Sequence, residues 1–383
     1  MNIYFLLSFR FLKAFRKGIL SFLSLFSIIG ITLGVSSLII VIGIMNGFKK
    51  EIENRLLKFT PHISIIPLNQ NLEFEEIKER IKLKTDVKDV KEYIILKTIV
   101  KANDKMDGVL LKAVDNLYSD MKKTIISGND DIKNGVLIGK GLAQKLNVIN
   151  GDTIEVYSVS NFIPYKLKIS GIVDAGIYDI NEHFIMTSIE NIRKLGNFPI
   201  SGIEVYLNEP SKAQKLSDDL RKHFENVSIF TWIDLNRNLF SALELEKLGM
   251  FIVLLLITIV ASFNIVSTLF ILSEQKSYDI AILRVFGFKS NDVIIVFLII
   301  GSIIGLIGIL GGVLLGFIIS FLITDLKIIK LQPEIYFIDY IPIKSTLFDY
   351  LIISFFAFLI VFVFSIVPSL RISKLKIRDV LKY

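Results

Sequence analysis

Residues 262–292 read SFNIVSTLFILSEQKSYDIAILRVFGFKSND, and the interpretation of the whole chain depends on this stretch. An uncharged run ends within it, a short charged segment from Glu274 to Lys289 follows, and a second uncharged run starts at Val293. Uncharged runs longer than about 18 residues are typical of transmembrane helices, because roughly 20 residues span the hydrocarbon core of a bilayer. The stretch therefore predicts two membrane spans joined by a compact amphipathic helix.

The composition indicates a membrane protein that also carries a large globular region. Of the 383 residues, 52% are hydrophobic, and the mean hydropathy is +0.59. Four long uncharged runs predict four transmembrane helices, within Gly18–Phe48, Gly249–Leu272, Val293–Thr324 and Leu347–Val367. The segment Lys49–Glu246 has the composition of a globular region and is long enough for one large or two small domains.

Basic residues cluster beside the first and last spans: they are Arg10, Lys13, Arg16, Lys17, Arg371, Lys374, Lys376, Arg378 and Lys382. The positive-inside rule then places both termini in the cytoplasm. With four spans, the large segment lies on the outer face of the membrane. The first apolar run is too long for a cleaved signal peptide, so we expect it to remain as an anchor.

Residues 2–17 have the spacing of an amphipathic helix. One helical face is basic and another is apolar, with Arg10, Lys13 and Lys17 on the first and Phe5, Phe9 and Leu12 on the second. Such a helix suits the cytoplasmic interface of a membrane. A plain positive flank before the first span is an equal alternative.

The outer segment mixes strand and helix patterns, so we expect an α+β domain. The strands predicted are 62–66, 93–101, 109–114, 153–157, 166–173, 184–187, 202–207 and 227–232, and the helices are 72–84 and 211–224. The strand–helix–strand order at its start recurs at its end. This favours an α/β subdomain built from both ends, with a β-rich subdomain inserted between them.

The predicted fold is an α-helical membrane protein with four transmembrane helices and a large extracytoplasmic α+β domain. Its divisions are 1–48 (amphipathic helix and first span), 49–245 (outer domain) and 246–383 (the remaining three spans). From Asp234 a helix is expected to run continuously into the second span. Pro368 is expected to mark the end of the fourth span.

Motifs for catalysis and metal binding are absent from the sequence. It contains no G-x-x-x-x-G-K-[ST] loop, no H-E-x-x-H and no G-x-S-x-G motif. The histidines His62, His183 and His223 stand singly, and there are no cysteines, which excludes disulfides and thiolate metal sites. Apart from Asp349, near the start of the fourth, no charged residue lies within a predicted span, which argues against an intramembrane proton relay. We therefore expect a non-enzymatic chain without a metal or cofactor that takes its energy from a partner.

The connector between the second and third spans has features of a docking helix. Ile280, Leu283 and Gly287 share one helical face, and charged residues lie beside them: Glu274, Lys276, Asp279 and Arg284. An apolar stripe with flanking charges suits the groove of a partner protein. A solvated cytoplasmic turn is the alternative.

The third span contains small residues at four-residue spacing. They form two sets, Gly301/Gly305 and Gly308/Gly312/Gly316. Glycines at this spacing let another helix approach closely. The partner helix could belong to this chain, or the surface could serve helix sliding or a second subunit.

Six short motifs in and around the spans form a recognisable set. They are Ile29-Gly-Ile-Thr-Leu-Gly-Val35, Met45-Asn-Gly-Phe48, Phe263-Asn-Ile-Val-Ser-Thr-Leu269, Asp279-Ile-Ala-Ile-Leu-Arg284 followed by Gly287, Val367-Pro-Ser-Leu-Arg371 and Asp379-Val-Leu381. Together they resemble the membrane subunits of the lipoprotein-releasing ABC transporters, the LolC/LolE family. That family belongs to the wider FtsX-like and MacB-like permease superfamily, and the resemblance covers the whole chain.

The resemblance implies a mechanism and a set of partners. Two such subunits, identical or different, would assemble with two copies of a separate LolD-like ABC ATPase in the bacterial inner membrane, and the connector helix would dock the ATPase. ATP would bind to that partner and drive lipoproteins from the outer leaflet to a LolA-like periplasmic carrier. By the same resemblance, a lipoprotein-contacting surface would lie around Met45, Phe48, Phe263 and Ile265.

One segment departs from the family pattern. Members that capture the carrier are expected to have an extended hook with prolines, whereas Ser158–Lys168 is short and contains only Pro164. Carrier capture by this chain or by its partner subunit therefore stays open. The other functions considered are efflux or mechanotransmission, as in the macrolide-exporter and cell-division permeases, and a membrane-anchored outer-face enzyme or sensor.

Overall fold

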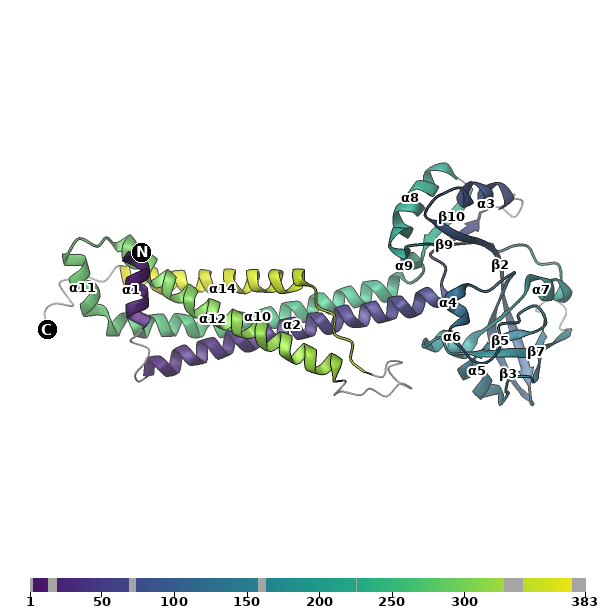
Figure 1. Cartoon of the computed structure of the whole chain (residues 1–383), viewed down its shortest axis with the longest axis horizontal. Coiled ribbons are helices and arrows are strands. Elements are labelled where there is room, and N and C mark those ends of the chain that lie inside the picture. The colour runs from purple at the N-terminus through teal and green to yellow at the C-terminus, as the bar shows by residue number, and fades with distance from the viewer. Residues whose placement is uncertain are drawn as a thin grey trace. The chain divides into compact units, whose positions relative to one another are not determined.

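The structure is a computed structural model that describes residues 3–12, 19–68, 74–157, 163–224, 226–326 and 340–373. The chain divides into two compact units, whose elements are labelled in Figure 1. The helical unit comprises Met1–Lys49, Ala242–Gln332 and Asp339–Tyr383, and the sheet unit is formed chiefly by Lys50–Ser241. Lys13, Lys17, the segment 158–162 of the expected hook and the basic residues beyond Arg371 lie outside the described residues.

Four described helices are long and apolar enough to cross a membrane, as the sequence predicts. They are α2 (Ile19–Phe59), α10 (Arg237–Gln275), α12 (Ser290–Asp325) and α14 (Leu347–Ser373). Helices α2 and α10 contain 41 and 39 residues, so at 1.5 Å per residue each is roughly 60 Å long, about twice the hydrocarbon thickness. Among the described residues, the helical unit also contains two short helices, α1 (Ile3–Leu12) and α11 (Ser277–Val285).

Two predicted helix ends differ from the structure. Helix α14 continues through Pro368 to Ser373, because a proline removes only one backbone donor and transmembrane helices tolerate that loss. The helix expected from Asp234 is interrupted. The short helix α9 (Trp232–Leu235) ends at Leu235 with Asn236 as its C-cap, and α10 starts at Arg237. Asn236 Nδ2 donates to Trp232 O at 2.8 Å and so stabilises the break.

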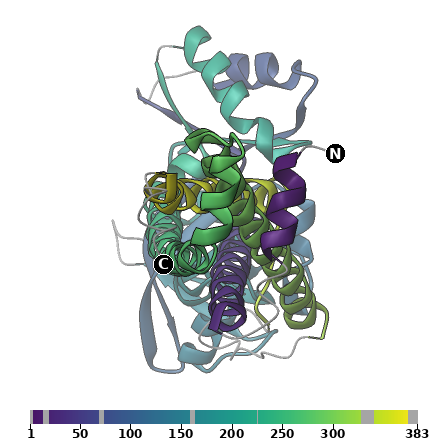
Figure 2. The same cartoon turned by 90° about the vertical axis from the view of Figure 1, so that its left-hand side faces the viewer.

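The core of the helical unit is formed where the four long helices meet. Ile31 of α2, Leu269 of α10, Phe297 of α12 and Val361 of α14 are fully buried in one cluster. Figure 2 shows this bundle from its end. A buried hydrogen bond between Ser27 Oγ and Thr268 Oγ1, 3.1 Å long, also links α2 to α10.

The described residues of the sheet unit form one mixed sheet of ten strands in the order β10-β1-β9-β2-β3-β8-β5-β7-β4, with β6 between β2 and β7. The strands are β1 (Ile63–Pro67), β2 (Val87–Ala102), β3 (Lys105–Val114), β4 (Ile125–Gly128), β5 (Val136–Gly139), β6 (Thr153–Tyr157), β7 (Pro164–Val173), β8 (Phe184–Thr187), β9 (Gly202–Leu207) and β10 (Val227–Thr231). The helices are α3 (Phe74–Lys82), α4 (Ser119–Lys122), α5 (Lys140–Leu146), α6 (Tyr178–His183), α7 (Ile189–Leu195) and α8 (Ala213–His223).

Strand β2 belongs to both parts of this sheet. Its first residues pair with β9 and its remainder with β3 and β6, so β2, β3, β8, β5, β7 and β6 close into a ring. Buried residues such as Leu111, Ile138 and Ile154 fill that ring. The other layer, β10-β1-β9-β2 with α3 and α8, comes from the two ends of the segment (Figure 1). The fold therefore has the predicted two parts, which share one strand.

Candidate functional site

The connector between α10 and α12 forms a short helix, α11. It follows Lys276, whose Nζ lies 2.8 Å from Asp279 Oδ2 and 5.7 Å from the ring centre of Phe11 in α1. Lys276 thus pairs with the first turn of α11 and makes a cation–π contact with α1. Glu274, near the end of α10, is exposed to solvent.

The end of α11 is a Schellman turn. The N–H of Phe288 donates to Leu283 O, and the N–H of Gly287 donates to Arg284 O, both at 3.1 Å. Gly287 has a φ of +102°, a conformation that favours glycine. Arg284 Nη2 donates to Ser290 Oγ at 3.3 Å. Gly287 and Arg284 therefore shape the turn that leads into α12.

The apolar stripe predicted for docking faces the chain's own core. Ile280 is 3% exposed, and Leu283 packs against the cluster formed by the four long helices. Ile280 and Leu283 thus contact the chain's own core in this structure, and their docking role stays a prediction. The apolar stripe packs α11 against the long helices. Periodicity alone does not show which side of a helix contacts another protein.

A different face of the connector is exposed and apolar. Val285 is 63% exposed, Phe286 is 82% exposed and Tyr278 is 55% exposed. Sequence reasoning missed these residues, although two large apolar residues directly before a glycine turn were a usable signal. Large aromatic side chains at this exposure are typical anchors of protein interfaces.

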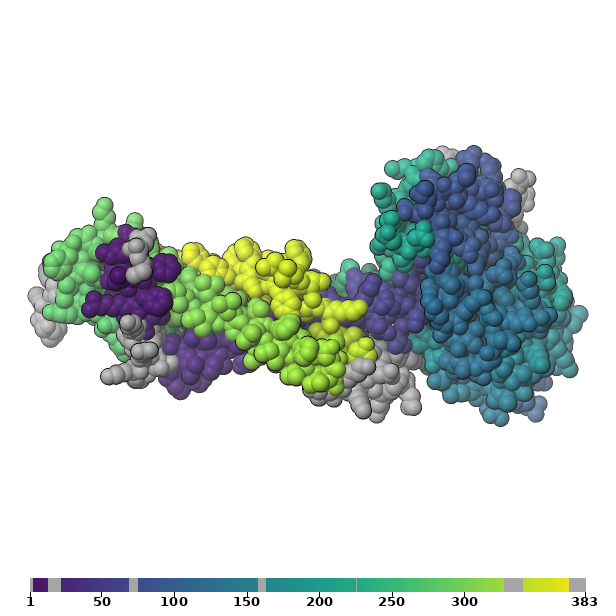
Figure 3. All heavy atoms as spheres, in the orientation of Figure 1, coloured from purple at the N-terminus to yellow at the C-terminus, as the bar shows by residue number. Residues whose placement is uncertain are grey.

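Helix α1 packs beside the connector (Figures 1, 2 and 3). Tyr4 O–H donates to Asp292 Oδ1 at 2.8 Å, and Ser8 Oγ donates to Val296 O at 3.1 Å. The first of these hydrogen bonds raises the pKa of the Tyr4 hydroxyl. The opposite side of α1 exposes large apolar residues, namely Ile3, Phe5, Leu6 and Phe9. Such a face suits the interface of a membrane.

The residues expected to contact lipoprotein are only partly accessible. Met45 is 8% exposed, and Ile265 is fully buried in the core of the helical unit. The helices of this chain cover these two side chains, and their contact with lipoprotein stays a prediction. Phe263 is 56% exposed with its ring 4.9 Å from that of Phe364, and Phe48 is half-buried.

The glycines of α12 pack inside the chain, against two different helices. Gly301 and Gly305 face Ser365 and Val361 of α14, whose side chains an added Cβ would overlap. The other set faces α2, where an added Cβ would lie 2.9, 2.7 and 3.1 Å from the Cβ opposite: the pairs are Gly308 with Ile31, Gly312 with Val35 and Gly316 with Ile39. Helix packing within the chain accounts for both sets.

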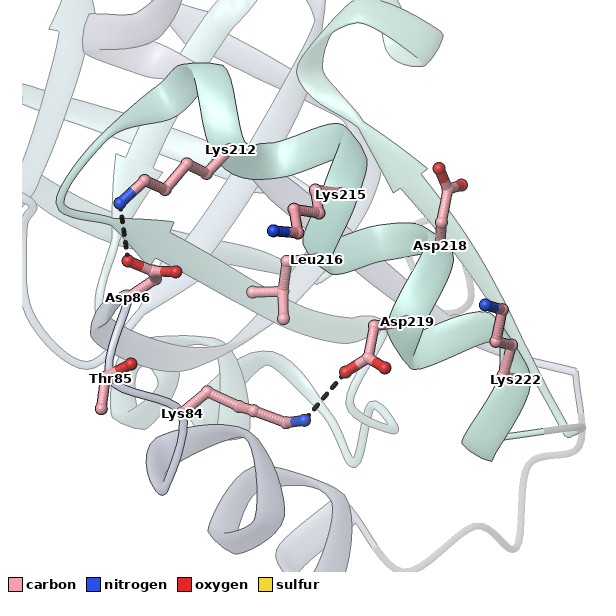
Figure 4. Close-up of a pocket in the computed structure, with 9 residues that line it drawn as sticks. All are labelled: Lys84, Thr85, Asp86, Lys212, Lys215, Leu216, Asp218, Asp219 and Lys222. Carbon is pink, nitrogen blue, oxygen red and sulfur yellow. Dashed lines mark hydrogen bonds and ion pairs between the residues drawn. The ribbon is translucent and has the colours of Figure 1, made fainter.

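The sheet unit has a surface pocket of about 440 Å³ beside α8 (Figure 4). Two ion pairs cross it, Lys84 Nζ to Asp219 Oδ2 at 2.8 Å and Lys212 Nζ to Asp86 Oδ1 at 2.9 Å. Its charges are mixed and largely paired. No group of His, Cys, Asp or Glu in the described part of the chain could hold a metal ion.

Comparison with known proteins agrees with this architecture. The model of the MacB-like periplasmic core domain matches residues 24–223, and that of the FtsX-like permease C-terminal domain matches residues 251–377. The lipoprotein-releasing system transmembrane protein LolC of Neisseria meningitidis is 31% identical over 406 residues, which cover 98% of this chain and 97% of that protein. The chain belongs to the LolC/LolE family.

Other relatives span the whole LolC/LolE architecture or its periplasmic part. The transmembrane protein LolE of Haemophilus influenzae is 26% identical, covering 100% of this chain and 99% of its own length. The periplasmic region of MacB from Actinobacillus actinomycetemcomitans aligns with 46% of this chain and 91% of its own at a TM-score of 0.34 and 14% identity. As a LolC/LolE protein, this chain is a membrane permease subunit with transmembrane helices and a MacB-like periplasmic domain.

Proposed function

We propose that this chain is the membrane subunit of an ATP-driven complex that extracts lipoproteins from the inner membrane and releases them to a periplasmic carrier. The observation that carries the proposal is similarity to a lipoprotein-releasing subunit along nearly the entire length of both chains. In this assignment ATP is bound and hydrolysed by a separate ABC ATPase. A second LolC/LolE-type subunit, identical or different, completes the membrane part.

The ATPase is proposed to dock on the exposed face of α11. Tyr278, Val285 and Phe286 supply apolar area there, and the exposed carboxylate of Glu274 lies on the same connector. Arg284 and Gly287 act indirectly by fixing the turn into α12. Because α11 is sealed onto the long helices by Ile280, a push on its outer face would be passed to those helices.

The proposed orientation follows from the basic flanks of the outermost spans. Both termini and α11 would lie in the cytoplasm, and the sheet unit would lie in the periplasm. A reporter enzyme inserted after Lys101 in the β2–β3 hairpin should then be active only outside the cytoplasm. If a reporter that works only in the cytoplasm were active at this position, the proposed orientation would be wrong.

Depletion of the protein tests the proposed function directly. Lipoproteins destined for the outer membrane should accumulate in the inner membrane within a few generations of depletion, measured by fractionating the two membranes. The matched control is depletion complemented with the wild-type gene. Normal delivery to the outer membrane in cells without a second release system would refute the proposal.

A further inference from the structure

The segment Met45–Phe48 lies where three helices meet, and its middle residues make contacts that lipid binding does not require. The Asn46 side chain lies between α10 and α14. Lys247 Nζ donates to Asn46 Oδ1 at 2.7 Å, and Asn46 Nδ2 donates to Asp349 Oδ2 at 3.2 Å. All three side chains are half-buried. One amide thus bridges a cation of α10 and a carboxylate of α14.

Two glycines of α2 admit the chain segment that leads into α14. A Cβ on Gly47 would overlap the carbonyl oxygen of Pro342, and a Cβ on Gly43 would overlap Ser345 Oγ. The N–H of Lys344 donates to Gly43 O at 2.8 Å. Residues four apart lie on one face of a helix. The segment 342–346 therefore crosses that face at backbone distance, which any other residue at these glycine positions would prevent.

The region where α2 meets α10 and the segment 342–346 is polar, and one buried hydroxyl group in it lacks a hydrogen-bond partner among the described residues. Ser345 Oγ is buried and has no hydrogen-bond partner within the described residues. A buried hydroxyl without a hydrogen-bond partner destabilises the arrangement that buries it, and a second arrangement that supplies a partner would relieve this cost. The closed arrangement therefore carries a local cost, as expected of an element with a second arrangement.

We propose that Asn46, Lys247 and Asp349 form a reversible clasp, here called the Asn46 clasp, which opens and closes during each release cycle. Closed, it ties α14 and its leading segment to α2 and α10. Open, it frees that end of α14 and lets Ser345 find a partner. Asn46 is a positioning residue that acts through the helices. The inference rests on the proposed function of the chain.

The first test exchanges the donor and the acceptor of the clasp. Asn46→Asp places a second carboxylate against Asp349 and should hold the clasp open. In the reconstituted complex with its ATPase, we expect membrane insertion and ATP hydrolysis to persist while release of a purified fluorescent lipoprotein per ATP falls roughly tenfold. Adding Asp349→Asn restores an amide–carboxylate pair and should restore release. Asn238→Asp, at an exposed position on α10, is the matched control.

Two results of the exchange would overturn the clasp. One is normal release by the Asn46→Asp variant, and the other is failure of the double variant to recover release. If the single variant does not insert into the membrane, recovery of insertion and release by the double variant still supports the pairing. If neither variant inserts, the crosslinking test below decides whether the clasp opens, because it uses neither the Asn46→Asp nor the Asp349→Asn substitution.

The second test uses the absence of cysteine from the chain. With Asn46→Cys and Asp349→Cys, a short thiol crosslinker should join the only two thiols without nucleotide, and should do so less with ATP and vanadate. The two cysteines remove the hydrogen bonds of the clasp, so this variant is compared with itself. Crosslinking by a reducible reagent should stop the release that the uncrosslinked variant retains, and reduction should return release to that level. Equal crosslinking with and without nucleotide, or normal release by the crosslinked protein, would show that the clasp does not open. The nucleotide effect needs no lipoprotein, so it tests the clasp even where the proposed cargo is wrong.

Discussion

Lys112 Nζ lies 2.5 Å from Glu204 Oε1, and both side chains are buried in the sheet unit. Lys112 is on β3 and Glu204 is on β9, and β2 runs between these strands. Tyr206 O–H donates to Glu204 Oε2 at 2.9 Å. The ion pair therefore joins the six-stranded ring to the layer β10-β1-β9-β2, across the strand β2 that belongs to both.

Removing one partner of this pair should destabilise the sheet unit strongly. We expect Lys112→Met to lower the free energy of unfolding by about 3–5 kcal/mol, because it leaves the Glu204 carboxylate buried and unpaired. Lys112→Met combined with Glu204→Leu should recover most of the loss. Trp232, the single tryptophan of the chain, is buried in this unit, so its fluorescence reports unfolding of the detergent-solubilised protein.

The exposed pair Lys84–Asp219 provides the control for that measurement. Lys84→Met should cost less than about 1 kcal/mol, because solvent screens exposed pairs. Equal losses from Lys84→Met and Lys112→Met would contradict the distinction between the two sites.

Stability should fall as pH is lowered through the range in which His62 titrates. The ring is 2% exposed and accepts the N–H of Leu207 at Nδ1, 2.8 Å away. Burial lowers the His62 pKa from 6.5 to about 4. The unfolded chain then takes up the proton first, so the stabilisation is complete above pH 6.5 and is lost as pH falls towards 4. The maximum loss is about 3 kcal/mol.

Replacing His62 by glutamine should reduce this pH dependence. The melting temperature of His62→Gln, followed by Trp232 fluorescence, should vary less between pH 6.5 and 4 than that of the wild-type protein. His223 is exposed on α8, and His223→Gln should retain the wild-type slope. A wild-type slope in His62→Gln would assign the pH dependence to other groups.

A side chain at Gly312 should separate α12 from α2. The Cβ of Gly312→Leu would start 2.7 Å from Val35 Cβ, and overpacking of this kind costs about 1–3 kcal/mol. Gly249 has nothing within 4 Å of an added Cβ, so Gly249→Leu should be tolerated. Thermal aggregation of the two variants in detergent distinguishes them, and equal melting temperatures would refute the contact.

A charge on the exposed face of α11 should weaken ATPase binding. Phe286→Asp removes a large apolar side chain from the proposed interface, and hot-spot residues of this kind contribute at least about 2 kcal/mol, or roughly thirtyfold in affinity. Copurification of the ATPase with the variant measures the loss. Leu83→Asp is the control, because Leu83 is 84% exposed in the sheet unit. Undiminished copurification of Phe286→Asp would move the docking site elsewhere.

Much of the fold can be predicted from local patterns in the sequence. The bounds of β6, β8 and β9 and the number of apolar helices agree with the patterns, because hydropathy and strand alternation depend on neighbouring residues. Family membership follows from motifs spread along the whole chain. These features needed no knowledge of which elements meet.

Only the tertiary structure shows which part of the chain, or solvent, each helix face contacts. The period of α11 places Ile280 and Leu283 on one side, but the bundle decides that this side is buried and that Phe286 is exposed. In the same way, Asn46 reads as part of a motif, and only the approach of α10 and α14 shows the bridge from Lys247 to Asp349. The reason is physical: helical periodicity fixes which residues share a face, whereas contacts between residues distant in sequence fix what that face touches.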